Sequence, residues 1–224
     1  TLPEIPGAGS AKHLSLKYSH PEWLAEYVIN NKDYDFAEGF FAANNVEPGL
    51  DIQVNRLKIT VEEYKKLLDE KGIEYVEEVP EGCILLKGGT ATELPGFEEG
   101  LFYVQDAAAK LSVLCAQLPA EDIRVLDCCA APGGKSTLLQ SLLPNGSLLV
   151  SNEPIAKRSQ ILSENIQKWM RGLPNDAPHC MVTQNYPADF AALTAQVDVL
   201  LTDVPCSGEG MFRKEEAAVT DWSV

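Results

Sequence analysis

The sequence has 224 residues, of which 45% are hydrophobic and 23% charged. This ordinary globular composition excludes a wholly disordered chain, and the length allows one large domain or two small ones. The net charge of −15 excludes a generally basic nucleic-acid-binding surface, so any RNA contact must come from a local patch or from another module.

The N-terminal part of the chain is predicted to hold a linker and then a small mixed module. Residues 1–17 contain Pro and Gly without periodicity, which indicates a linker. Apolar spacing predicts helices, alternation predicts strands, and a capping-box pattern from Thr60 to Glu63 opens one of the helices. The predicted helices lie at residues 21–30, 34–45 and 60–72, and the predicted strands at 51–59, 73–79 and 83–88.

The second part begins with a predicted helix at residues 103–118, and then strands and helices alternate. The predicted strands lie at 123–129, 146–152, 179–185 and 197–205, with helices at 133–143 and 155–170. Short apolar strands alternating with helices are typical of a parallel, doubly wound α/β sheet. We therefore predict a Rossmann-like domain over residues 99–224, preceded by a small α+β module over residues 18–98.

A run of small residues follows the first strand of the predicted parallel sheet, in the segment DCCAAPGGK from Asp127 to Lys135. Gly133 and Gly134 lack side chains, so the backbone there can approach a ligand closely. Free N–H groups at the start of the next helix attract a carboxylate or a phosphate. The alternative is a tight turn without a ligand. The spacing does not match a P-loop, which disfavours a nucleotide triphosphatase.

Two further signals stand at the ends of later predicted strands. Glu153 follows the second strand, where an acid can accept the ribose hydroxyls of a nucleoside; alone, it would be an ordinary surface acid. Asp203 and Cys206 belong to the segment DVPCSG after the fourth strand. A Cys at that edge can act as a nucleophile or in proton transfer, although most free Cys residues are simply buried apolar groups.

The remaining composition excludes several kinds of partner and site. No apolar run is long enough to span a membrane, and the first twenty residues lack the apolar core of a signal peptide. The six Cys form no C-x-x-C pair, which argues against a zinc site, and the adjacent Cys128 and Cys129 in a strand-to-loop context argue against a disulfide framework. We therefore expect a cytoplasmic protein with no metal and no membrane partner.

In the two motifs after the first and fourth predicted strands, the chain resembles the RsmB/RsmF (Sun) family of RNA cytosine-C5 methyltransferases. DCCAAPGGK and DVPCSG resemble that family's motifs I and IV. Residues 16–24, 53–60 and 102–111 are similar to the RsmB branch, whereas residues 151–169 and 203–214 are closer to the RsmF branch. The resemblance covers nearly the whole chain and implies an RRM-like, RNA-binding small module before a class I methyltransferase domain.

The resemblance also implies a cofactor, S-adenosylmethionine, and an RNA substrate, expected to be ribosomal RNA. The methionine moiety would lie against Cys129, Ala130, Ala131, Pro132, Gly133, Gly134 and Lys135. Glu153 would hold the ribose with Arg158 nearby, and Asp203 would lie near the cofactor and the target base. Arg56, Lys58, Arg213 and Lys214 are candidate RNA contacts, although solvated surface charge is the plainer interpretation of each.

The chemistry of the family requires two thiols. Cytosine C5 is a poor nucleophile, and addition of a thiolate at C6 makes C5 reactive toward a methyl donor; the C5 proton and the thiolate must then leave. The resemblance assigns attack to a Cys in a Thr-Cys turn after the fifth strand and assigns product release to Cys206. By position alone, Cys206 could instead be the nucleophile, as in the DNA enzymes.

The sequence departs from the family's pattern in two places. Gln184, Asn185 and Tyr186 stand where the family has an acid after the third strand, which puts adenine recognition in doubt. The chain ends at Val224, so we expect a sheet truncated after its fourth strand and a chain that is inactive alone. The alternative functions are a non-catalytic cofactor- or RNA-binding fragment and a small-molecule methyltransferase on the same fold.

Overall fold

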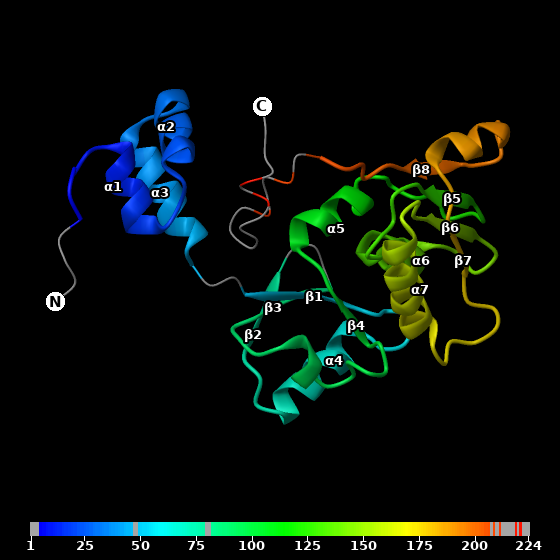
Figure 1. Cartoon of the computed structure of the whole chain (residues 1–224). Coiled ribbons are helices and arrows are strands. Elements are labelled where there is room, and N and C mark those ends of the chain that lie inside the picture. Colours follow the sequence, from blue (N-terminus) through cyan, green and yellow to red (C-terminus); the bar gives the residue numbers. More distant parts are fainter. Residues whose placement is uncertain are drawn as a thin grey trace. The chain divides into compact units, whose positions relative to one another are not determined.

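The computed structural model describes residues 5–46, 49–78, 82–206, 208, 211, 218 and 220, without the side chains of Glu77 and Glu78. The chain divides into two compact units. One comprises residues 1–48 and 205–224, and the other residues 49–204. Figure 1 labels the elements of both. None of the helices in the described ranges is long and apolar enough to cross a membrane.

Residues 11–44 of the first unit form a cluster of three helices, α1 (Ala11–Tyr18), α2 (Glu22–Asn31) and α3 (Tyr34–Asn44). The predicted linker over residues 1–17 is therefore wrong in its second half. The Pro and Gly residues lie before the helix, and the side chain of Ser10 caps it by accepting a hydrogen bond from the His13 amide. Leu14 of α1 is fully buried in one apolar cluster with Phe41 of α3.

The second unit begins with a four-stranded antiparallel sheet and one helix. The strands are β1 (Leu50–Val54), β2 (Tyr75–Glu78), β3 (Cys83–Leu86) and β4 (Phe102–Val104), in the order β2-β3-β1-β4. Helix α4 (Val61–Glu70) starts at the predicted capping box and packs Tyr64 and Leu68 against Ile52 and Ile84 of the sheet. This sheet and helix correspond to the part of the predicted small α+β module after residue 48, whereas α2 and α3, which the prediction included from residue 18 on, belong to the first unit. A short 3-10 helix, η1 (Ala91–Glu93), lies between β3 and β4.

Strand β4 corrects the predicted boundary of this module. Residues 103–118 were expected to form one helix, and the module was expected to end at residue 98. Instead, Val104 pairs with Ile52 of β1, and β4 completes the sheet. Helix α5 (Ala107–Leu114) begins only after Asp106, whose carboxylate accepts hydrogen bonds from two amides of the first turn. Pairing with β1 and the cap at Asp106 override the helical spacing of residues 103–106.

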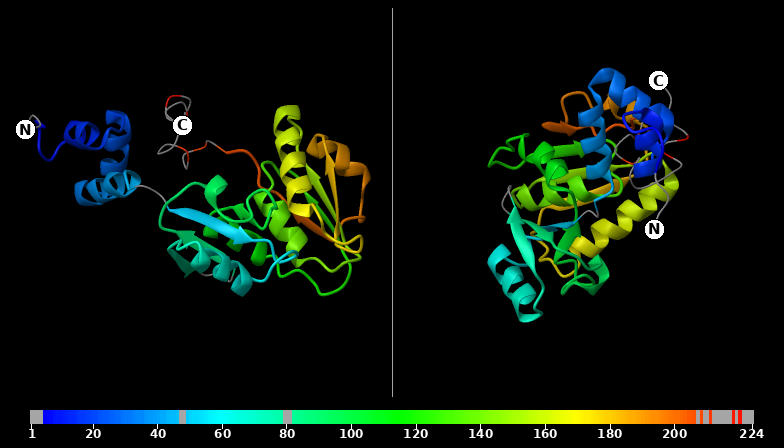
Figure 2. Two further views of the ribbon diagram at one scale, coloured as in Figure 1. Left: turned by 90° about the horizontal axis from the view of Figure 1, so that it is seen from below. Right: turned by 90° about the vertical axis from the view of Figure 1, so that its left-hand side faces the viewer.

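A parallel sheet follows, as predicted. Its strands are β5 (Arg124–Asp127), β6 (Leu148–Asn152), β7 (His179–Thr183) and β8 (Val199–Leu201), in the order β7-β6-β5-β8. Helices α6 (Gly134–Leu142) and α7 (Ala156–Met170) lie side by side against this sheet (Figures 1 and 2). A second 3-10 helix, η2 (Pro187–Ala192), precedes β8. The strand order places the carboxyl ends of β5 and β6 at the centre of one edge.

Three buried or half-buried side chains fasten the small sheet to the parallel-sheet region within this unit. The ammonium of Lys110, fully buried on α5, donates to the Ile52 carbonyl at 2.8 Å. Asn55 donates to the Trp169 carbonyl at 3.0 Å, and Lys58 donates to the Lys168 carbonyl at 3.1 Å. The end of α7 is therefore tied to the loop that follows β1. The ammonium of Lys58, a candidate RNA contact, is hydrogen-bonded at this junction.

Candidate functional site

The loop from Asp127 to Gly133 joins the carboxyl end of β5 to α6. Gly133 has φ of +117°, a conformation that side chains rarely adopt, and it stands at the N-cap of α6. A Cβ at Gly134 would lie 3.1 Å from Cδ of Gln105 and 3.2 Å from Cε1 of Tyr103. Gly133 is therefore required by its backbone conformation, whereas a side chain at Gly134 would fit only if Gln105 or Tyr103 shifted. Gly133 offers no side-chain cap to the first turn of α6.

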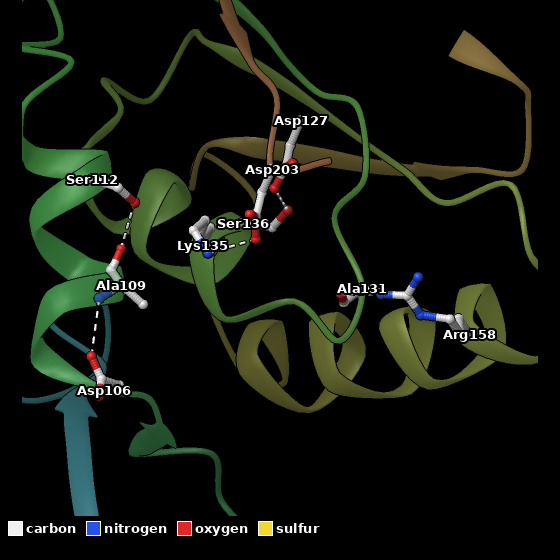
Figure 3. Close-up of polar contacts among 9 residues, drawn as sticks. All are labelled: Asp106, Ala109, Ser112, Asp127, Ala131, Lys135, Ser136, Arg158 and Asp203. Carbon is white, nitrogen blue, oxygen red and sulfur yellow. Dashed lines mark hydrogen bonds and ion pairs between the residues drawn. The ribbon is translucent and has the colours of Figure 1, made fainter. Parts of the chain in front are cut away.

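Side chains from two other elements hold this loop by its carbonyls. Arg158 of α7 donates to the Ala131 carbonyl at 3.0 Å (Figure 3). The Pro132 carbonyl accepts hydrogen bonds from the Tyr103 hydroxyl at 3.0 Å and from the Asn165 amide at 2.8 Å. With its carbonyls fixed outward, the loop is preorganised, which lowers the entropic cost of ligand binding.

A cavity of about 180 Å³ lies between this loop and the segment that joins β4 to α5. Seven of the predicted site residues line it: Cys129, Ala130, Ala131, Pro132, Gly134, Lys135 and Asp203. Tyr103, Gln105 and Asp127 also face it. Gly133, Glu153 and Arg158 are not among the lining residues. The structure thus brings most of the predicted set together around one hollow.

Asp127 is the most strongly perturbed acid of this cavity. It is fully buried, and burial raises its pKa from 3.8 to about 6. One carboxylate oxygen accepts a hydrogen bond from the Ser136 hydroxyl at 2.7 Å (Figure 3), and Ser151 donates in turn to Ser136 at 2.8 Å. The other oxygen has no hydrogen-bond partner among the described residues. It is therefore available to a ligand or to a proton.

Glu153 lies at the end of β6 with a side chain that is 1% exposed. One of its oxygens accepts from the Ile155 amide at 3.1 Å. The other lies 3.4 Å from Nη1 of Arg158, as an ion pair, and makes no hydrogen bond within the described ranges. A buried carboxylate oxygen with a charged neighbour but no donor is suited to accept a hydrogen bond from a ligand hydroxyl.

Asn152, next to Glu153, ties the ends of three strands together. Its fully buried amide donates to the Cys128 carbonyl at 3.0 Å and to the Asn185 carbonyl at 2.9 Å. Its oxygen accepts from the Asn185 amide at 2.9 Å and from the Thr183 hydroxyl at 3.0 Å. Asn185 stands where an acid was expected from the family's pattern, and it is held here through its backbone.

The residues after β8 are less enclosed. The carboxylate of Asp203 forms an ion pair with Lys135 at 2.7 Å (Figure 3). Cys206 is an exposed free cysteine. Arg213 and Lys214, predicted as RNA contacts, lie outside the described residues. Burial, followed by the charge of Glu153, raises the pKa of Cys129, and burial also raises the pKa of Cys128, so both thiols of the loop stay protonated at neutral pH.

Sequence reasoning missed several residues of this site. Tyr103, Gln105 and Asn165 come from other elements, and no local motif marks them. Tyr103 and Gln105 do belong to the segment FYVQDAAAKL, whose similarity to known proteins was the available signal. No group of three potential metal ligands occurs within the described residues.

Two family models match the chain. The model described as 16S rRNA methyltransferase RsmB/F matches residues 115–221, and the model described as the ferredoxin-like domain of RsmF/B-like methyltransferases matches residues 20–92. The order and directions of β1 to β4 agree with a ferredoxin-like sheet, with η1 and its flanking loop in place of the second helix.

Curated proteins and a solved structure are similar to the chain. A probable ribosomal RNA small subunit methyltransferase B from Coxiella burnetii is 32% identical over 205 residues, which cover 91% of this chain and 47% of that protein. Ribosomal RNA small subunit methyltransferase F from Shewanella oneidensis is 36% identical over 77% of this chain and 36% of that protein. The chain therefore spans less than half of these relatives. A methyltransferase homologue from Pyrococcus horikoshii shares the fold, with a TM-score of 0.72 at 23% identity over 91% of this chain and 65% of that one.

Proposed function

The chain belongs to the RsmB/F family of 16S rRNA methyltransferases, and from that premise we propose that it binds S-adenosylmethionine at the loop after β5 for methylation of a cytosine in ribosomal RNA at C5. The observation that carries the proposal is the cavity between this loop and the β4–α5 connection, beside a buried Glu153 whose carboxylate has an oxygen without a donor. We further propose that the protein acts in the cytoplasm, with RNA as its partner.

The residues present fit the cofactor. The loop from Cys129 to Lys135, with its two glycines, suits the methionine moiety, whose carboxylate would be attracted by the free amides at the start of α6. The oxygen of Glu153 that lacks a donor suits the ribose hydroxyls, and Arg158 forms an ion pair with the same carboxylate. When bound, the cofactor supplies an electrophilic methyl group on a positively charged sulfur.

The protein's own contribution is positioning. Tyr103 and Asn165 fix the loop through the Pro132 carbonyl, so the loop does not need to order when ligand binds. Asp203 pairs with Lys135 at the open side of the cavity, where a target base would approach. Asp127 lies beneath the loop and carries a proton over part of the neutral pH range. These groups orient the donor and set the charge beside it.

Cys206 is proposed to assist release of the methylated base rather than to attack C6. None of the six cysteines of this sequence follows a Thr, as the attacking residue does in the family. The matched test measures transfer of tritiated methyl groups to bulk ribosomal RNA by the chain and by a Cys206→Ala variant. We expect turnover by neither. Clear turnover that disappears in the variant would identify Cys206 as the attacking thiol.

Deletion of the coding sequence in its host tests the function of the protein as a whole. Bisulfite sequencing of ribosomal RNA from the deletion strain should lose 5-methylcytosine at a single position of the small subunit, and the intact gene should restore it. A deletion strain with an unchanged pattern of 5-methylcytosine would contradict the proposed reaction. Loss of a methyl group from another atom or base would support methyltransferase activity but refute the cytosine-C5 assignment.

A further inference from the structure

A second cavity, of about 220 Å³, lies where the small sheet meets the end of α7. Phe97, Phe102, Tyr103 and Trp169 line it, together with Asn165 and Lys168. All belong to the unit of residues 49–204. Its volume is below the roughly 300–1,000 Å³ of sites for drug-sized ligands, so its occupant is of the size of a single aromatic ring system.

The aromatic rings that line this cavity are tilted or edge-on to one another and do not stack in parallel. The centroids of Phe97 and Phe102 are 6.1 Å apart, and those of Tyr103 and Trp169 are 6.5 Å apart in an edge-on arrangement. Unpaired bases of RNA are held in proteins by stacking on such side chains. Apolar walls alone would also suit other rings, so the polar groups decide what the cavity takes.

The polar groups point to a ligand that carries hydrogen-bond acceptors. Trp169 is 1% exposed, and its indole N–H has no hydrogen-bond partner in the described part of the chain. An orphaned buried donor is costly unless something pairs with it. The Asn165 amide already donates to the Tyr103 hydroxyl and the Pro132 carbonyl, and the ammonium of Lys168 lies over one face of the Phe97 ring, 3.1 Å from its centroid. A base offers ring nitrogens and carbonyl oxygens to the Trp169 indole and to the Lys168 ammonium.

The charge around the cavity supports RNA only locally. The positive charge of Arg171 and the negative charges of Glu98 and Glu99 all act on Lys168, so the charges around it are of both signs. In a chain of net charge −15, this mixed cluster gives limited attraction for phosphate. Recognition must therefore depend mainly on contacts to the base, and the affinity for RNA should depend only weakly on salt concentration.

We propose that this cavity binds one unpaired base of the RNA substrate, neighbouring the base that is methylated, by contact with the aromatic rings that line it and by a hydrogen bond from the Trp169 indole. The inference rests on the proposed function. Tyr103 and Val104 line both this cavity and the cofactor cavity, and the Tyr103 hydroxyl holds the cofactor loop through Pro132. A base stacked beside Tyr103 therefore sits within reach of the site that holds the methyl donor.

The test uses the whole chain and a short, unpaired, fluorescently labelled oligoribonucleotide, with binding followed by anisotropy. Phe97→Leu should weaken binding roughly ten-fold, because it removes one of the aromatic rings that line the cavity. Trp169→Phe should weaken it about three- to ten-fold, because it removes the donor. Trp23→Phe, the matched substitution at a half-exposed Trp of α2, should leave affinity unchanged. Thermal melting of each variant shows whether it is folded.

Abasic substitution in the RNA separates base binding from a structural role. Placing an abasic residue at each position in turn should reduce the affinity of the wild-type chain at one position, and that position should lose its importance in Phe97→Leu. Equal affinities for folded variants and wild type, or failure of the wild-type chain to bind RNA, would overturn the inference. Calorimetric binding of S-adenosylmethionine to the same samples tests the cofactor part of the proposed function separately.

Discussion

Asp127→Asn should make the stability of the protein less dependent on pH. The rise in the pKa of Asp127 from 3.8 to about 6 means that its ionised form is unfavourable in the folded protein by about 3 kcal/mol. The folded state binds the proton more tightly than the unfolded state, so this group's penalty is absent below about pH 4 and grows as pH rises toward 6. It is complete above about pH 7.

An Asn carries no such charge, so the variant escapes the penalty. Its amide replaces an oxygen that has no partner, at a cost of roughly 1–3 kcal/mol that does not change with pH. As the pH rises from about 5 to about 8, the stability of the variant relative to wild type should therefore increase by roughly 1–2 kcal/mol.

Urea denaturation at both pH values measures this change, with the emission of buried Trp169 reporting on the same unit. Asp176→Asn, at an exposed loop position, is the matched control and should show no such difference. A relative stability that is constant with pH, or one that falls as pH rises, would refute the assignment of Asp127 as a protonated buried acid.

Three further substitutions test the site. Gly134→Val should abolish binding of S-adenosylmethionine as measured by calorimetry, because even its Cβ would crowd Gln105. Gly39→Val, with open space around it, should bind normally. Equal binding by both variants would show that the loop is not part of the binding site. Tyr103→Phe should weaken that binding about two- to ten-fold, since it frees the loop at Pro132, and an unchanged affinity would show that the loop is rigid without it. Asn152→Ala should destabilise the protein by roughly 2–4 kcal/mol in urea denaturation, because several buried groups lose their partner, and a loss below about 1 kcal/mol would mean that water replaces the amide.

The parallel sheet could be predicted from the sequence because its strands are short apolar runs and its helices follow them closely. The predicted strand at residues 123–129 contains β5, and the predicted helix at 155–170 contains α7. The capping box at Thr60 placed the start of α4 for the same local reason. Each of these elements is specified within a few residues, so tertiary packing reinforces the local signal instead of overriding it.

The errors concern elements that depend on distant partners. Helix α1 forms where Pro and Gly suggested a linker, because Leu14 is buried by α3 rather than by its own neighbours. Strand β4 is only three residues long, and its partner β1 lies about fifty residues earlier in the chain. The polar groups that complete the candidate site, Tyr103 and Asn165, are brought to the loop by these long-range contacts.

Calorimetric titration of S-adenosylmethionine into the chain and into its Glu153→Gln variant tests the central claim most directly. The claim requires one site in the wild-type chain. It also requires a loss of about ten-fold or more in affinity in the variant, since a hydrogen bond to an ionised carboxylate contributes roughly 1.5–3 kcal/mol. Thermal melting of the variant serves as the control for folding. Absence of binding by the wild-type chain, or equal affinity in a folded Glu153→Gln variant, would contradict the assignment of this cavity and its buried acid to the methyl donor.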